Sequence, residues 1–100
     1  MYGTVSKMRL VPGSEPFLMA QFEAMRGHRE EGFVSSTIYR SDDDPLELWV
    51  AVVFESREAY RANAESETQD VVYRRMRSAL EADPEWHDGE VILDVRADPA

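Results

Sequence analysis

The sequence contains no cysteine, two histidines and few basic residues, with 11 Lys and Arg against 20 Asp and Glu. Without cysteine, the chain forms no disulfide, no iron–sulfur cluster, no thiolate nucleophile and no cysteine-containing zinc site. The net charge of −9 opposes binding to a phosphate backbone, so we expect no nucleic-acid partner. The apolar run around Trp49 to Phe54 is far too short for a membrane-spanning helix, so we expect no membrane partner either.

A chain of 100 residues is too short for two independent cores. We therefore expect one acidic domain over residues 1–97, followed by a short tail at 98–100. The start of the sequence lacks the basic segment, apolar run and small-residue cleavage site of a secretion signal, and we expect a cytoplasmic protein. A domain of this size buries only about two-thirds of the surface of its unfolded chain, which favours self-association through an apolar face.

The first part of the chain predicts a strand followed by a helix. Side chains of two kinds alternate over residues 2–11, as on a strand with two unlike faces. Pro12 and Gly13 break this strand, and Ser14 is expected to cap the following helix. Leu18 and Phe22 belong to its apolar stripe, and glycines place its end between Arg26 and Glu31.

The middle of the chain predicts a hairpin. Residues 33–40 and 46–55 are rich in β-branched and aromatic types, and a polar turn at 41–45 separates them. Both faces of the second strand are apolar, because Leu48 and Val50 alternate with Trp49 and Ala51. A sheet with helices on one side leaves its second face in water, so we expect this face to pair with a second copy of the chain.

The last part predicts two helical segments and a strand. The first segment covers residues 56–64, and the second begins at a capping box of Ser66 and Gln69 and stops before Pro84. Alternation over residues 90–96 predicts the last strand. The order βαββαβ is that of an α+β, ferredoxin-like domain, with a four-stranded antiparallel sheet and helices on one face.

Motifs for metal, nucleotide or serine-hydrolase chemistry are absent. His28 and His87 have no second histidine at helical spacing, and the run Asp42 to Asp44 lacks the spacing and glycine of a calcium loop, so we expect no metal site. His28 is expected at the surface near a helix end. His87 has two interpretations: a base beside Asp88, or a solvent-facing residue next to an anchoring Trp86.

Aromatic residues and methionines at helical or strand spacing supply either a packed core or a pocket between the sheet and the helices. A pocket of this kind would hold a planar apolar molecule. Its walls are expected from Trp49, Trp86, Phe22 and Met76. Its hydrogen bonds are expected from Tyr60, Asn63 or His87.

Two segments carry a resemblance to a known family. They are LWVAVVFESREAYRANA at residues 48–64 and WHDGEV at residues 86–91, supported by Gly-Phe-Val at residues 32–34. Together they resemble the antibiotic biosynthesis monooxygenase domain family over nearly the whole chain. The resemblance implies a dimeric α+β barrel in which two ferredoxin-like subunits pair their sheets back to back.

The functions implied by the resemblance diverge. Some members oxidise polycyclic phenols with molecular oxygen and no cofactor, some open haem, and others act on small metabolites. Haem-opening members use an asparagine on the first strand and a histidine on the helical segment after the third strand. Here the first strand offers Thr4 and Ser6, and no histidine lies between Leu46 and Glu85, which disfavours haem degradation. The resemblance places Asn63 at a position that often carries a histidine; an asparagine can donate to an oxyanion but cannot act as a base, which weakens the case for an enzyme.

The leading hypothesis is therefore a cofactor-independent monooxygenase that acts on a planar aromatic or quinone-like molecule. Asn63 and Tyr60 are expected to donate hydrogen bonds, and His87 is expected to act as the base. The alternative is a non-catalytic dimer that binds a small molecule or serves in a stress response.

Overall fold

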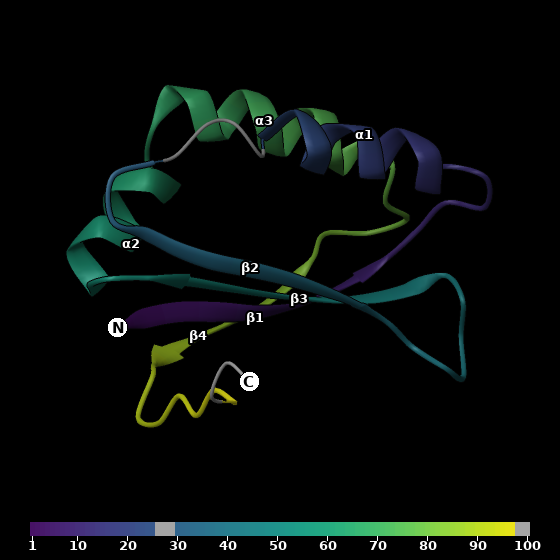
Figure 1. The fold of residues 1–100 in the computed structure, drawn as a ribbon. Helices are drawn as coiled ribbons and strands as arrows, with labels where there is room; N and C mark the ends of the chain where they lie inside the picture. The colour runs from purple at the N-terminus through teal and green to yellow at the C-terminus, as the bar shows by residue number, and fades with distance from the viewer. Residues whose placement is uncertain (26–29, 98–100) are drawn as a thin grey trace.

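The computed structural model describes residues 1–25 and 30–97, with the exception of the Met25 side chain. Its four strands form one antiparallel sheet in the order β2-β3-β1-β4, and its three helices lie on one face of that sheet (Figure 1). This is the expected ferredoxin-like α+β fold. His28, the predicted end of the first helix and the tail at 98–100 lie wholly or largely outside the described residues. In chain order the elements are β1 (Tyr2–Arg9), α1 (Glu15–Met25), β2 (Phe33–Arg40), β3 (Glu47–Phe54), α2 (Arg57–Ala64), α3 (Glu67–Arg77) and β4 (Glu85–Glu90).

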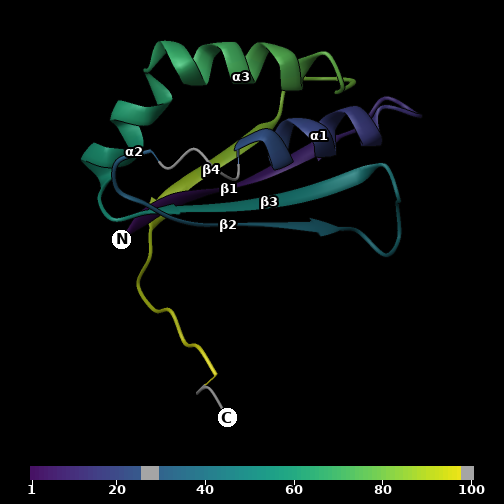
Figure 2. The same ribbon diagram turned by 45° about the horizontal axis from the view of Figure 1, so that its top comes forward.

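The strand register gives the sheet two faces of different character, because successive side chains of a strand point to opposite sides. We call the face covered by the helices the helix-side face and the other the open face (Figure 2). The helix-side face carries Thr4, Ser6, Met8, Leu48, Val50, Val52, Trp86 and Asp88. The open face carries Val5, Lys7, Thr37, Tyr39, Trp49, Ala51, Val53 and His87.

The core lies between the helix-side face and helices α1 and α3. Leu18 of α1 and Met76 of α3 are buried, as the predicted apolar stripes require. Phe22 packs against the same cluster while remaining partly exposed. The other buried apolar side chains are Met8, Leu10, Leu48, Val50, Phe54, Ala79 and Leu80.

Serine side chains define the starts of α2 and α3. The Ser56 hydroxyl accepts a hydrogen bond from the Ala59 amide at 3.0 Å, and the Ser66 hydroxyl accepts one from the Gln69 amide at 3.1 Å. Both satisfy amides that the first helical turn leaves unpaired. Ser14 lies directly before α1, where its carbonyl accepts from the Leu18 amide at 3.0 Å. Its hydroxyl donates to the Ala79 carbonyl at 2.7 Å and ties the start of α1 to the end of the α3 region.

The last strand is displaced from its predicted position. The prediction of a strand over residues 90–96 is wrong, because β4 covers Glu85–Glu90 and pairs with β1 from Lys7 back to Tyr2. The pairing partner ends there, where the Val91 amide donates to the Met1 carbonyl at 2.9 Å. The following segment leaves the sheet on the side opposite to the helices (Figure 2). Its apolar side chains are exposed, at 91% for Ile92, 77% for Leu93 and 79% for Val95.

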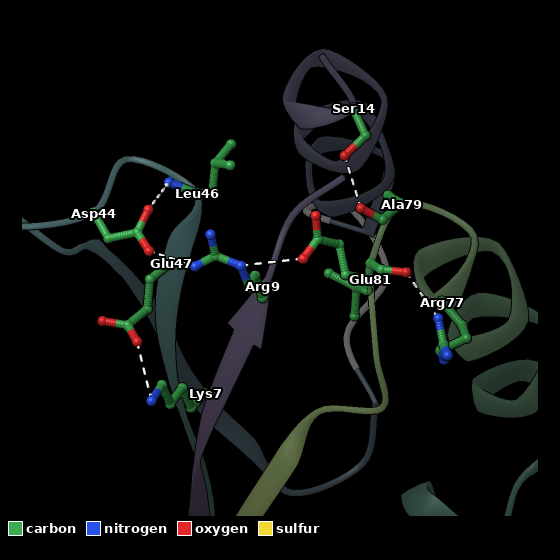
Figure 3. A network of polar contacts seen from close by, with 10 residues as sticks. Lys7, Arg9, Ser14, Asp44, Leu46, Glu47, Arg77, Ala79 and Glu81 are labelled. Atoms are coloured by element: carbon green, nitrogen blue, oxygen red, sulfur yellow. Dashed lines mark hydrogen bonds and ion pairs between the residues drawn. The ribbon is translucent and has the colours of Figure 1, made fainter. Parts of the chain in front are cut away.

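A polar network ties the end of β1 to the hairpin turn (Figure 3). Arg9 bonds Asp44 on the turn and Glu81 after α3, the latter at 3.1 Å, while Lys7 pairs with Glu47 at 3.1 Å. Lys7 also lies 5.7 Å from the centre of the Trp49 ring on the open face. Within residues 1–25 and 30–97, no helix has the length and apolar character needed to cross a membrane.

Candidate functional site

A cavity of about 660 Å³ opens between the helix-side face and helices α2 and α3. Its size falls within the range of about 300–1,000 Å³ that is usual for small-molecule sites. Phe22, Met76 and Trp86 line it, as the sequence predicted for a pocket between sheet and helices. Trp86 is 45% exposed and lies 6.5 Å, ring centre to ring centre, from Tyr73 of α3. The predicted wall residues on the helix side therefore do surround a cavity.

A hydrogen-bonded pair, Tyr60 and Asp88, is the polar feature of this cavity. The Tyr60 hydroxyl on α2 donates to Asp88 Oδ1 on β4 at 2.8 Å, and both residues line the cavity. Burial, and then the hydrogen bond to Asp88, raise the pKa of Tyr60 to about 12. The phenol therefore stays protonated at neutral pH and acts as a hydrogen-bond donor.

Aromatic packing fixes the position of the Tyr60 ring. Its centre lies 5.3 Å from that of Tyr2 and 5.8 Å from that of Phe54, which it meets edge to face. Phe54 in turn meets Phe33 edge to face at 5.7 Å. Such pairs favour one orientation of each ring. The hydroxyl of Tyr60 is therefore aimed at β4 by packing as well as by its hydrogen bond.

Two buried side-chain oxygens, on β1 and on α2, lack a hydrogen bond of normal geometry within the described chain. Thr4 Oγ1 lies in the cavity lining directly across the β1–β4 ladder from Asp88. Asn63 Oδ1 is buried one helical turn after Tyr60. Thr4 also interacts with the Tyr60 hydroxyl, which works against the rise in the pKa of Tyr60, so a molecule that reaches the Tyr60–Asp88 pair also reaches Thr4 Oγ1. Asn63 itself is not among the residues that line the cavity.

Two of the predicted site residues lie on the other face of the sheet. His87 pairs with Val5 and Trp49 pairs with Lys7, so their side chains belong to the open face and away from the cavity. The expectation that Trp49 forms a wall and His87 supplies the base does not fit this placement. The displaced last strand is the reason, because residues 86–88 lie within β4 and alternate between the two faces.

The same alternation brings Asp88 into the cavity, and the sequence analysis missed this residue. The available signal was weak, because residues 85–90 contain glycine and acidic residues that are poor strand formers. Pairing with β1 overrides that local preference. Once Thr4 is known to face the helices, its neighbour across the ladder, Asp88, must do so too. No group of three or more possible metal ligands occurs in the part of the chain that the structure describes.

Comparison with known proteins supports the same fold. A cofactor-independent oxygenase from Streptomyces nogalater, SnoaB, superposes with a TM-score of 0.81 at 14% identity, covering 96% of this chain and 97% of that one. A putative antibiotic biosynthesis monooxygenase from Chloroflexus aurantiacus superposes with a TM-score of 0.77 at 24% identity, covering 95% of this chain and 96% of that one. Rv0793 from Mycobacterium tuberculosis superposes with a TM-score of 0.79 at 18% identity, covering 95% of this chain and 98% of that one.

A search among curated protein sequences found no match. Residues 1–79 match the sequence family described as antibiotic biosynthesis monooxygenase. That match spans β1 to the end of α3, and thus every helix that borders the cavity. The chain belongs to the antibiotic biosynthesis monooxygenase family.

Proposed function

We propose that the chain is a monooxygenase that oxidises a planar, acidic aromatic molecule, such as an anthrone or a hydroquinone, in the cavity between the sheet and helices α2 and α3. The observation that carries the proposal is the Tyr60–Asp88 pair inside a cavity of about 660 Å³. The family and the structural neighbours support the same reaction type. Phe22, Met76 and Trp86 hold the ring system in this proposal.

The chemistry needs few protein groups, because an ionised anthrone is itself the reductant of oxygen. Asp88 accepts the acidic proton through the carboxylate oxygen that Tyr60 does not occupy. Because Asp88 is then neutral, the Tyr60 hydroxyl turns its single hydrogen from Asp88 to the oxyanion that forms. The anion passes an electron to dioxygen and the two radicals combine. The resulting peroxide anion takes the proton back from Asp88, and loss of water from the hydroperoxide leaves a quinone. One oxygen atom is thus retained and the other leaves as water.

Oxygen uptake with a panel of anthrones and hydroquinones tests this proposal. We expect turnover by the unmodified chain and a loss of about a hundredfold for Asp88→Asn, as for removal of a general base. Asp94→Asn is the matched control, because this residue follows β4, pairs with Arg96 and lies outside the cavity. His87→Ala separates the two candidate bases, and we expect it to keep its activity.

No turnover with any member of the panel, together with measurable binding, would favour the alternative function of a non-catalytic small-molecule-binding protein. Equal turnover by the unmodified chain and Asp88→Asn would remove the assigned base. A loss in His87→Ala that matches or exceeds that in Asp88→Asn would move the base to the open face.

The open face supports a second part of the proposal, that the chain acts as a homodimer. Tyr39 is 61% and Val5 is 45% exposed there, next to Trp49, Ala51 and Val53, and the apolar segment after β4 projects on the same side. Apolar patches of this kind mark protein interfaces. Sedimentation should show a dimer that Ala51→Glu dissociates and that Ala62→Glu, on the exposed side of α2, leaves intact. A monomeric unmodified chain would contradict this part.

A further inference from the structure

Basic side chains are scarce in this chain, and most of them form an ion pair with a carboxylate. The sequence has 11 Lys and Arg against 20 Asp and Glu. Lys7 and Arg9 are held in the network of Figure 3. The other ion pairs join Arg40 to Glu15, Arg74 to Asp70, Arg77 to Asp83 and Arg96 to Asp94. Within the described residues, the guanidinium groups without a carboxylate partner are those of Arg57, Arg61 and Arg75.

Two of these three line the cavity. Arg57 and Arg61 are four residues apart on α2, so they lie on the same side of the helix, and both belong to the cavity wall. The guanidinium carbon of Arg57 lies 5.7 Å from the centre of the Tyr2 ring, and this contact limits the positions of the guanidinium group. Arg75 of α3 does not line the cavity.

Three carboxylates share the cavity wall with these two guanidinium groups, but none forms an ion pair with either of them within the described residues. Asp70 is paired with Arg74 at 2.9 Å, and Asp88 accepts the Tyr60 hydrogen bond. Glu65, at the end of α2, is the remaining carboxylate of the described wall. Because neither guanidinium group is in an ion pair with a described carboxylate, the N–H donors of Arg57 and Arg61 remain free for a carboxylate of a bound molecule.

We propose that Arg57 and Arg61 bind a carboxylate carried on the ring system of the aromatic ligand, so that the substrate class is an aromatic acid. The inference rests on the proposed function, because it assigns a ligand to the same cavity. Guanidinium groups match a carboxylate through two parallel N–H donors, which fixes orientation as well as affinity. The acid group lies at α2 and the rings extend toward Trp86 and Met76.

Binding of a matched ligand pair tests the inference without any oxidation step. Isothermal titration calorimetry compares 3-hydroxy-2-naphthoic acid with its methyl ester, which has the same rings and no charge. We expect the acid to bind about fivefold more tightly than the ester, which is the upper end of the effect of an exposed ion pair. Arg61→Gln should reduce this preference and leave the affinity for the ester unchanged. Arg75→Gln is the matched control and should retain the preference.

The outcomes separate this inference from the proposed function. Equal affinity for acid and ester would overturn the role of Arg57 and Arg61 and leave the aromatic cavity intact. Equal loss of preference in Arg61→Gln and Arg75→Gln would show a long-range charge effect and would also overturn it. Binding of neither ligand would overturn both. A preference for the acid in a protein that consumes no oxygen would support the inference and contradict the monooxygenase alone.

Discussion

The Tyr60–Asp88 hydrogen bond allows a quantitative test, because its two partners come from α2 and β4 and can be removed separately. We consider a double-mutant cycle of Tyr60→Phe, Asp88→Asn and the double variant. A hydrogen bond to a charged partner contributes about 1.5–3 kcal/mol when sheltered from water. Asp88 is exposed and Tyr60 is partly buried, so solvent competes for both groups. We therefore expect a coupling free energy of about 1 kcal/mol.

Urea unfolding followed by tryptophan fluorescence measures the four stabilities at neutral pH. Tyr60→Phe retains the ring contacts with Tyr2 and Phe54, so the cycle isolates the hydroxyl. We expect the double variant to be less destabilised than the sum of the two single variants. Strict additivity would refute the reasoning, because it would mean that the hydroxyl and the carboxylate do not interact in solution.

Three further predictions concern stability. Because the pKa of Tyr60 is raised from 10.0 to about 12, the contribution of Tyr60 to stability is complete below pH 10 and is lost as the pH rises toward 12. Tyr60→Phe should remove this alkaline loss of stability, measured by unfolding at increasing pH. The same loss in Tyr60→Phe as in the unmodified chain would contradict the prediction. Arg9 and the Leu46 amide hold the pKa of Asp44 below its usual 3.8, so its contribution is present above that pH and disappears as the pH falls further. Asp44→Asn should therefore flatten acid unfolding followed by circular dichroism, whereas Asp43→Asn on the same turn should not. Ser66→Ala removes a cap and should cost about 1 kcal/mol in urea unfolding, with Ser78→Ala as a control expected within about 0.5 kcal/mol.

Much of the fold follows from local patterns in the sequence. Alternation in residues 2–11 predicts that β1 has two unlike faces, and β2 has its predicted bounds. The serines before α2 and α3 cap their helices as predicted, because a cap needs only residues close in the sequence.

Features that depend on distant pairing were not predictable in this way. Residues 90–96 alternate as a strand should, yet β1 ends at Tyr2 and leaves them without a partner in the chain. The shift by a few residues changes which face each side chain occupies, and with it the site. It takes His87 out of the cavity and brings Asp88 into it. Tyr60 and Trp86 needed no such correction, because their cavity positions agree with the prediction.

The position of the two tryptophans provides the most direct test of where the ligand binds. Trp86 lines the cavity on the helix-side face, whereas Trp49 lies on the open face beneath Lys7. Their indole N–H resonances can be followed separately in a ¹⁵N correlation spectrum and assigned with Trp49→Phe. On titration with 3-hydroxy-2-naphthoic acid, we predict a large shift of the Trp86 resonance and little change at Trp49. A shift confined to Trp49 would place the ligand on the open face and contradict the account.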